Sequence, residues 1–340
     1  MSIQAELAQI GARLADQTTG GVIAATDGAD DWVVPFGVVD ESDRAGIAAD
    51  AAHVFRFTSI SKPFTAIQVL TLVDEGRLDL HAPVCEYIPE FGVAHKGAVT
   101  TAQMLSHTSG VDPSANLIEG PQTPLTAGGY LQAALEVGLI TPAGTVFAYC
   151  SPTFWVLGEL VSRLTGVPYP EHLRERVLTP MGADHANYRL GQVEGRLVLP
   201  RTPPGLEHLP DQTTLVPYPA GGLIGRASDL LALGRCMFSD GMGARGRVIT
   251  SAAARLMRRP TAAGMIAGRA VQWGFGWELG GPGNLRNDTA LYHGGASGVA
   301  MWVDLDAQIC ATVLTCTWGT PRKVFSEAIN GIIGAFGRTS

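Results

Sequence analysis

Phe57-Thr58-Ser59-Ile60-Ser61-Lys62-Pro63-Phe64 opens a helical pattern that continues to residue 75 and ends at Gly76. Ser59 and Lys62 are three residues apart, so a helix places both side chains on one face, with Cβ atoms roughly 5–6 Å apart. Pro63 is tolerated if this stretch is the first helical turn, where free amides favour negative charge. A serine hydroxyl becomes a good nucleophile when a neighbour takes its proton, and a desolvated lysine can do so or stabilise a phenolate that does. Taken alone, the pattern also fits a helix N-cap serine followed by a surface lysine.

The choice of basic residues draws attention to position 62. The chain has 21 arginines but only three lysines, at Lys62, Lys96 and Lys323. Arginine holds its proton under all ordinary conditions, whereas a buried lysine can lose it. A lysine at this place in an arginine-rich chain therefore favours a role in proton transfer.

A second candidate is Tyr149, in the stretch Tyr149-Cys150-Ser151-Pro152. Ser151 and Pro152 form a typical N-cap and first position for the helix that the pattern predicts over residues 153–164. Local amides and a nearby lysine are then expected to lower the pKa of Tyr149, and a tyrosinate is a competent general base. The alternative is a tyrosine that only packs beneath the helix start.

The third candidate is the stretch 293–298, His-Gly-Gly-Ala-Ser-Gly, beside a predicted strand. Paired glycines at a strand edge allow another backbone to approach closely. A backbone amide in this stretch could then complete an oxyanion hole with the amide of Ser59. His293 could orient the substrate or hydrogen-bond the catalytic groups. The alternative is a glycine bulge with an incidental histidine.

The composition excludes several classes of function. Hydrophobic residues make up 46% and charged residues 16% of the chain, which is typical of a globular protein. The net charge of −7 speaks against nucleic-acid binding, and the doublet Arg258-Arg259 is too short to form a phosphate-binding stripe. The histidines lack metal-ligand spacing, so we expect neither a metal nor another cofactor. The N-terminal residues lack a signal-peptide pattern and the apolar stretches are short, so we expect a cytoplasmic protein without membrane contact. The five cysteines show no C-x-x-C pair, so we expect free thiols.

The order of predicted elements favours an α+β fold. A first helix precedes strands at 21–26, 31–39 and 53–58, and further strands follow at 271–279, 290–293, 299–304 and 308–317 before a helix at 322–336. Helical patterns dominate the middle. We expect one α/β domain built from residues 1–58 and 245–340, a mainly helical domain over residues 59–244, and an active site between them. Long loops at 110–128 and 191–222 are expected to supply pocket residues.

Together, these stretches resemble the class C β-lactamase-like serine hydrolases. The resemblance spans nearly the whole chain and rests on FTSISKPFTA (57–66), QMLSHTSGV (103–111), PAGTVFAYCSPTFWVLGELVSRLTG (142–166), AGGLIGRASDL (220–230) and HGGASG (293–298). S-x-x-K is a signature of β-lactamases and penicillin-binding proteins. The family implies a mainly antiparallel sheet flanked by helices from both chain ends, as in β-lactamases and transpeptidases, beside an all-helical domain.

The resemblance also implies roles for individual residues. Ser59 would attack the acyl carbon, Lys62 and Tyr149 would share the general acid and base work, and the amides of Ser59 and Ala296 would form the oxyanion hole. The remaining expected substrate contacts are His293, Gly294, Gly295 and Ser151.

Two departures from the family pattern shape the predicted function. The family usually has Asn where Ser151 stands, and β-lactamases usually have Lys where His293 stands. The missing Asn weakens the case for β-lactam or peptide substrates, and His at position 293 resembles the esterase and peptidase branches of the family. We therefore predict a carboxylesterase that acts on a small ester through an acyl-Ser59 intermediate. The alternatives are an acyltransferase that passes the acyl group to an amine or alcohol in a biosynthetic pathway, a β-lactamase or D-aminopeptidase, and a binding protein that kept the fold; the oligomeric state stays open.

Overall fold

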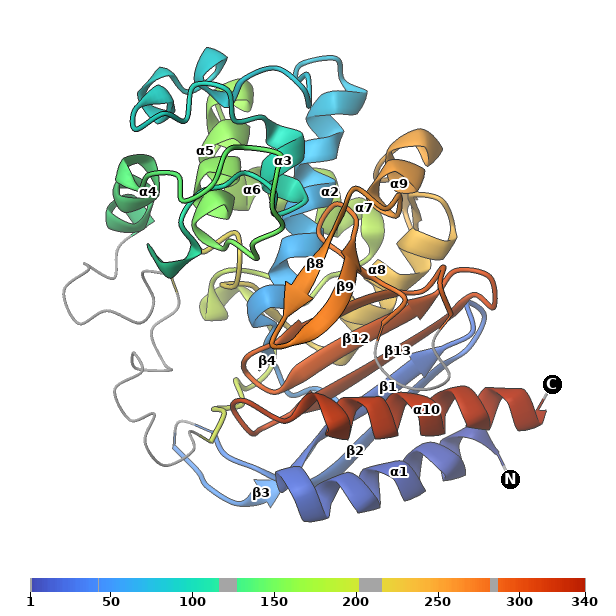
Figure 1. Cartoon of the computed structure of the whole chain (residues 1–340). Coiled ribbons are helices and arrows are strands. Elements are labelled where there is room, and N and C mark those ends of the chain that lie inside the picture. Colours follow the sequence, from blue (N-terminus) through green and yellow to red (C-terminus); the bar gives the residue numbers. More distant parts are fainter. Residues whose placement is uncertain (1, 42, 116–126, 202–215, 282–286, 340) are drawn as a thin grey trace.

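A nine-stranded antiparallel sheet, built from both ends of the chain, forms the centre of the fold (Figure 1). The computed structural model describes residues 2–41, 43–115, 127–201, 216–281 and 287–339. The strand order is β3-β2-β1-β13-β12-β11-β10-β9-β8. The strands are β1 (Gly20–Thr26), β2 (Asp31–Val39), β3 (Ile47–Ala48), β8 (Ala262–Ile266), β9 (Arg269–Trp273), β10 (Glu278–Leu279), β11 (Leu291–Gly295), β12 (Val299–Asp304) and β13 (Ile309–Thr315).

Helices cover both faces of this sheet, which explains why its central strands are apolar throughout. β1 is buried along its whole length and pairs with β13 in a register that sets Ile23 opposite Val313. Helices α1 (Ile3–Thr18) and α10 (Arg322–Thr339) lie side by side on one face, and α8 (Ala227–Phe238) packs on the other. A strand that is buried on both faces has no reason to alternate apolar and polar residues.

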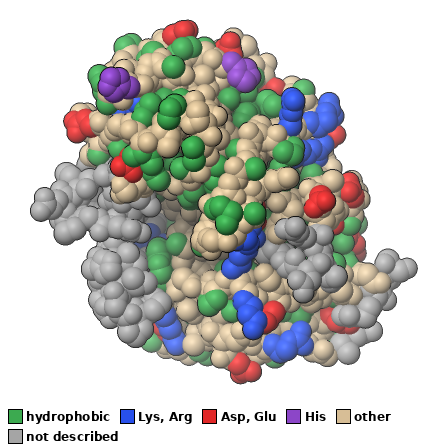
Figure 2. Space-filling view, in the orientation of Figure 1, with side chains coloured by type: hydrophobic (Ala, Val, Ile, Leu, Met, Phe, Trp, Pro, Cys, Tyr) green, Lys and Arg blue, Asp and Glu red, His purple; other side chains and the backbone are tan. Residues whose placement is uncertain are grey.

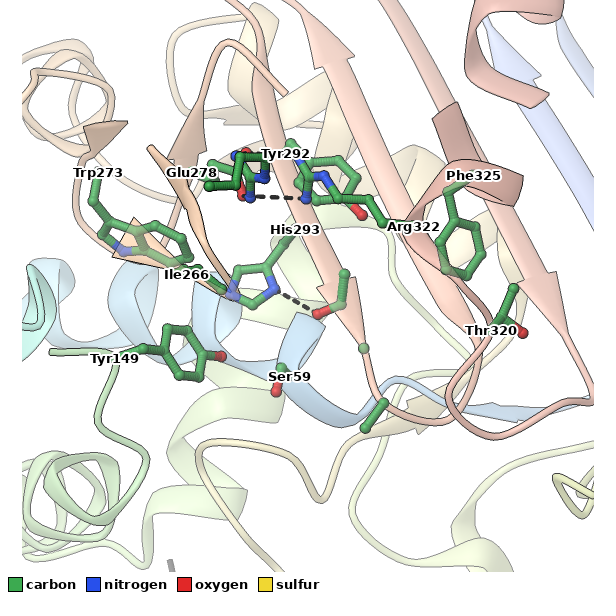
Figure 3. A pocket seen from close by; sticks show the side chains of 14 residues that line it. Ser59, Tyr149, Ile266, Trp273, Glu278, Tyr292, His293, Thr320, Arg322 and Phe325 are labelled. Carbon is green, nitrogen blue, oxygen red and sulfur yellow. Dashed lines mark hydrogen bonds and ion pairs between the residues drawn. The ribbon is translucent and has the colours of Figure 1, made fainter. Parts of the chain in front are cut away.

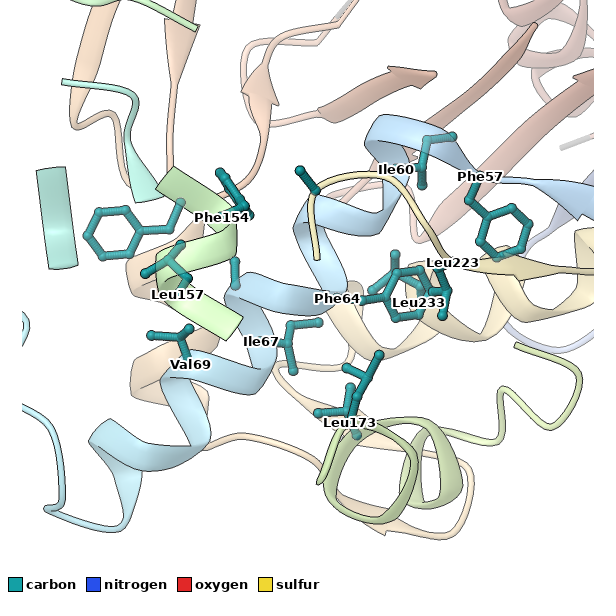
Figure 4. Close-up of a cluster of buried hydrophobic side chains, with 14 of the residues drawn as sticks. Phe57, Ile60, Phe64, Ile67, Val69, Phe154, Leu157, Leu173, Leu223 and Leu233 are labelled. Atoms are coloured by element: carbon teal, nitrogen blue, oxygen red, sulfur yellow. The ribbon is translucent and has the colours of Figure 1, made fainter. Parts of the chain in front are cut away.

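The middle of the chain forms the helical part. Its helices are α2 (Ser61–Asp74), α3 (Thr101–Leu105), α4 (Ala127–Glu136), α5 (Pro152–Thr165), α6 (Tyr169–Leu173), a π-helical turn (Arg174–Leu178), α7 (Thr179–Met181) and α9 (Ser251–Met257), with short pairs β4 (Phe55–Arg56)–β5 (Ile224–Gly225) and β6 (Met242–Gly243)–β7 (Gly246–Arg247). α2 runs through the core of this part and is buried from Ser61 to Leu72 (Figure 4). Each fully buried side chain such as Phe64 or Ile67 contributes about 1.5–3 kcal/mol, so the start of α2 is firmly held.

The sheet and its flanking helices confirm the expected α+β, β-lactamase/transpeptidase-like class, with differences in detail. The strand predicted over 271–279 is two strands, β9 and β10, separated by a turn in which Gly276 has φ +75. The strand predicted over 53–58 is reduced to the two residues of β4. Strand β8 was not predicted. The division into domains at residues 58/59 and 244/245 stays a prediction.

No helix in the described ranges combines the length and the apolar character that crossing a lipid bilayer requires.

Candidate active site

Ser59 lies in a single 3-10 turn, Thr58–Ile60, that leads directly into α2. The turn is entered through Thr58, whose φ of +41 is a strained value for a β-branched residue. Ser59 is half-buried, and its side chain points into a cavity (Figure 3). The sequence predicted that Ser59 lies in the first turn of the helix; in the structure it lies in a tighter 3-10 turn just before the α-helix.

Lys62 lies beneath Ser59, with 1% of its surface exposed. Its Nζ is 3.3 Å from the Ser59 Oγ and 3.0 Å from the carbonyl oxygen of Ala220. Burial lowers the pKa of Lys62 from 10.5 to about 7, because the charged amine loses its hydration. A large share of the lysine is therefore neutral near pH 7, and a neutral amine can accept the proton of Ser59.

Tyr149 lies near both Ser59 and Lys62. Its hydroxyl oxygen points toward Ser59 in Figure 3. Burial raises the pKa of Tyr149, and the nearby Ser59 hydroxyl opposes that rise only in part. The sequence-based expectation of a lowered tyrosine pKa is therefore wrong, because the loss of hydration outweighs local dipoles. The Lys62 Nζ lies 4.8 Å from the centre of the Tyr149 ring.

Ser59 and Ala296 both line the cavity, and hydroxyl contacts hold together the two segments that carry them. The Ser297 Oγ donates to the carbonyl oxygen of Arg56 at 2.6 Å, and the Ser297 amide donates to the Thr58 Oγ1 at 3.4 Å. These bonds tie the turn between β11 and β12 to the residues before Ser59. In the described part of the chain neither the Ser59 nor the Ala296 amide has a hydrogen-bond acceptor, so both can bind an oxyanion.

Gly295 is required for this close approach. A Cβ atom at this position would lie 2.3 Å from the Thr58 Oγ1 and 2.5 Å from the carbonyl oxygen of Phe57. Any side chain here would push the β11–β12 turn away from the nucleophile turn. The close backbone approach that the paired glycines predicted is therefore present at Gly295.

His293 is buried in the wall of the same cavity. Its Nδ1 donates to the carbonyl oxygen of Gly294 at 2.9 Å, which leaves Nε2 as an acceptor with no partner among the described residues. Burial, and then the charge of Lys62, lower the pKa of His293 to about 3. A neutral His293 can accept a hydrogen bond but supplies no positive charge.

Ser151 lies outside the cavity lining. It is 9% exposed, and burial of Tyr218 raises the pKa of that phenol, a rise that the nearby Ser151 opposes. A direct substrate contact by Ser151 remains a prediction.

The cavity has a volume of about 290 Å³ and opens on the face that Figure 2 shows hollowed between the helical part and the sheet. It unites predicted residues from three distant stretches, which are Ser59, Tyr149, His293, Gly294, Gly295 and Ala296. No sequence motif pointed to the other lining residues, which are Ile266, Arg269, Trp273, Glu278, Tyr292, Thr320, Arg322 and Phe325. Most belong to β8–β11 or the start of α10, and only the expected strand pattern hinted at them.

One cluster among the missed residues carries charge. The buried carboxylate of Glu278 accepts two hydrogen bonds from Arg269, both at 2.9 Å, and two from Arg322, at 2.7 and 3.3 Å. The Arg322 guanidinium also lies 4.4 Å from the centre of the Tyr292 ring. This cluster joins β9, β10 and α10 at one side of the cavity. The loops expected to supply pocket residues fall partly outside the described residues, at 116–126 and 202–215.

Residues 3–334 match the model of the Beta-lactamase family. The chain belongs to this family. Penicillin-binding protein 4 of Amycolatopsis lactamdurans is 32% identical over 251 residues, which are 69% of this chain and 64% of that protein. Esterase EstB of Burkholderia gladioli is 27% identical over 311 residues, 78% of this chain and 77% of that protein. The chain spans 52% to 64% of the length of several curated relatives that it matches.

Solved structures place this Beta-lactamase family member in the same fold. The structure described as EstCE1, a hydrolase with promiscuous acyltransferase activity, superposes with a TM-score of 0.81 at 21% identity and covers 97% of this chain and 98% of that one. At this identity the likeness concerns the fold.

Proposed function

We propose that the protein is a serine hydrolase that forms an acyl-enzyme on Ser59 and acts as a carboxylesterase on small esters. The observation that carries this proposal is the 3.3 Å contact between the Ser59 Oγ and the Nζ of a fully buried Lys62, below a cavity with two free amides. A hydroxyl, a base of suitable pKa and an oxyanion site are the minimum set for acyl transfer.

In the proposed acylation step, neutral Lys62 accepts the Ser59 proton as Oγ attacks the ester carbonyl carbon. The carbonyl oxygen becomes an oxyanion and is bound by the amides of Ser59 and Ala296. The C–O bond to the alcohol then breaks, the Tyr149 hydroxyl donates a proton to the leaving oxygen, and the Lys62 ammonium restores that proton. Deacylation repeats these transfers with water as the nucleophile.

The raised pKa of Tyr149 and the lowered pKa of Lys62 support these two proposed roles. Near pH 7 the lysine can accept a proton and the tyrosine can give one, which is the pairing that acid–base catalysis needs. Because the lysine must be neutral to act as the base, kcat/KM is expected to rise with pH through about 7 and then level off.

The test is a burst experiment with p-nitrophenyl butyrate. We expect rapid release of p-nitrophenol and a butyryl mass on Ser59, both abolished in Ser59→Ala. Ser61→Ala is the matched control, since Ser61 is a neighbouring serine whose Oγ accepts from the Leu223 amide at 3.1 Å. A fluorophosphonate probe, which reacts covalently with activated serines, should still label Ser59 in this variant. Full turnover by Ser59→Ala would end the proposal.

An acyltransferase that passes the acyl group to an amine or alcohol is the second candidate. It shares every step up to the acyl-enzyme, and the family neighbour EstCE1 is described as a hydrolase with promiscuous acyltransferase activity. Trapped butyryl-enzyme, offered a series of alcohols and amines, distinguishes the two. Water as the sole productive acceptor would leave the hydrolase alone.

We also propose a cytoplasmic location. All five cysteines are free thiols, four of them buried, which suits a reducing compartment. Cell fractionation checks this, and recovery of the active enzyme in the culture medium would contradict it.

A further inference from the structure

The proposed acid, Tyr149, lies in a segment without regular secondary structure, between a turn at residues 143–145 and the start of α5. The amides on either side of it are nevertheless both anchored. The Ala148 amide donates to the carbonyl oxygen of His107 at 2.8 Å, and the Cys150 amide donates to the His107 Nδ1 at 3.1 Å. One residue, about forty positions earlier in the chain, thus fixes both peptide units around Tyr149.

The His107 ring also supports the phenol ring itself. The two ring centres are 4.4 Å apart at an angle of 37°. His107 is fully buried, and its other ring neighbours include Phe154 and Trp273, with ring centres 5.6 and 5.2 Å away. His107 is absent from the lining of the Ser59 cavity, so it can influence catalysis only through the residues it holds.

The backbone of residues 107–110 is shaped for this contact. His107 has φ +59, a left-handed conformation that histidine, asparagine and aspartate adopt more readily than most residues. The neighbouring Thr108 carbonyl oxygen accepts from the Gly144 amide at 2.7 Å, and the Gly110 carbonyl oxygen accepts from the Ile140 amide at 2.8 Å. The stretch Ser-His-Thr-Ser-Gly at 106–110 therefore runs along the tyrosine segment and braces it at several points.

The protonation state of His107 is defined by this arrangement. Nδ1 accepts the Cys150 amide, so it carries no proton, and the ring proton is on Nε2, which has no partner among the described residues. Burial, followed by the charges of Lys62 and His293, holds the pKa of His107 well below its usual value. A neutral ring is the form that can accept the amide hydrogen bond.

We propose that His107 is a positioning residue, which sets the Tyr149 hydroxyl against Ser59 by fixing the Ala148 and Cys150 amides on either side of it. This inference rests on the proposed serine-hydrolase function. A misplacement of about 1 Å in a reacting group can lower the rate about 100-fold, so a brace on both sides of Tyr149 has a measurable effect on kcat.

The test compares two amide variants, His107→Asn and His107→Gln. The Asn carbonyl oxygen reaches the place of Nδ1 and accepts the Cys150 amide, and Asn tolerates a positive φ. The Gln carbonyl oxygen reaches toward the place of Nε2, away from the Cys150 amide. We expect His107→Asn to retain kcat for p-nitrophenyl butyrate within about tenfold and His107→Gln to lose about 100-fold, with KM changed less than threefold in both.

A double-mutant cycle shows whether the effect passes through the tyrosine. In a Tyr149→Phe background the step from Asn to Gln at position 107 should change kcat less than twofold, because no hydroxyl remains to be positioned. Equal kcat for the two amide variants, or the same 100-fold loss without the hydroxyl, would overturn the proposal. Ser59→Ala is assayed beside them: if it stays active, the hydrolase assignment fails instead.

A measurement on the unaltered enzyme covers the case in which the variants do not fold. Nitrogen NMR of the histidine-labelled protein at pH 7 should show His107 with an unprotonated Nδ1 and a protonated Nε2, and the Cys150 amide should exchange slowly with solvent. A protonated Nδ1 on His107, or a fast-exchanging Cys150 amide, would likewise overturn the inference.

Discussion

Replacing Lys62 by Met removes a buried amine whose protonation the folded protein opposes. Burial lowers the pKa of Lys62 from 10.5 to about 7, and each pH unit corresponds to about 1.4 kcal/mol, so the folded state disfavours the charged amine by about 5 kcal/mol. Since the folded pKa lies below the unfolded one, the unfolded chain binds more protons between pH 7 and 10.5. The free energy of unfolding therefore rises with pH across this window, by about 2–3 kcal/mol between pH 6 and pH 9.

The Met variant has no amine to charge, so it lacks this free-energy cost, but it also loses two contacts. The hydrogen bonds of Lys62 to Ser59 and to the Ala220 carbonyl oxygen contribute about 1 kcal/mol each. We expect Lys62→Met to be about 3 kcal/mol more stable than the wild type at pH 6 and close to it at pH 9, although it can no longer be acylated.

Urea unfolding followed by tryptophan fluorescence measures this difference at pH 6, 7, 8 and 9. Ser59→Ala is the control, because it retains the amine and should keep the pH dependence of the wild type. Parallel stability curves for the wild type and Lys62→Met over this range would refute the reasoning, since they would mean that the folded protein does not oppose the charge of Lys62.

Four further substitutions test the site. Lys62→Arg should nearly abolish burst acylation, because a guanidinium keeps its proton; near-normal bursts would remove Lys62 from the mechanism. Tyr149→Phe should lower kcat about 10²- to 10⁴-fold in steady-state assays, and an unchanged kcat would exclude the tyrosine as the acid. Gly295→Ala should lower kcat about 10²- to 10³-fold, as loss of an oxyanion donor does, and wild-type kinetics would show that the crowding of the new Cβ against Thr58 is relieved easily. Glu278→Gln should lower the free energy of unfolding by about 1–3 kcal/mol in urea titrations. This is less than for a fully buried ion pair, because both arginine partners are about one-third exposed to solvent. An unchanged unfolding midpoint would show that the cluster contributes little to stability.

Local sequence patterns predicted the residues that need a particular chemistry. Ser59, Lys62, Tyr149 and Ala296 each stand in a stretch whose spacing, helix-start residues or paired glycines mark them out, and the structure gathers Ser59, Tyr149 and Ala296 around one cavity with Lys62 beneath. One sheet built from both chain ends followed from the strand patterns at each end, and its antiparallel character was implied by the family resemblance. These features depend on short-range spacing, which the sequence displays directly.

The missed features depend on contacts between distant residues. The hairpin of β8 and β9 turns at Ala267-Gly268, where both residues have positive φ, and Ala carries no signal for such a turn. The hairpin brings Arg269 into the cavity wall, where Glu278 and Arg322 meet it. The sign of the Tyr149 pKa shift was missed for a related reason, because burial depends on the whole fold.

The pairing of β1 with β13 joins residues 20–26 to residues 309–315 at the centre of the sheet. During synthesis, β1 therefore remains without this partner until nearly all of this chain has left the ribosome, while the helical part is already made. Such long-range closure is slow, and the half-built sheet exposes the unpaired edge of β1 in the meantime. Yield in a recombinant host should therefore depend on growth temperature and chaperone supply more strongly than the stability of the finished enzyme would suggest.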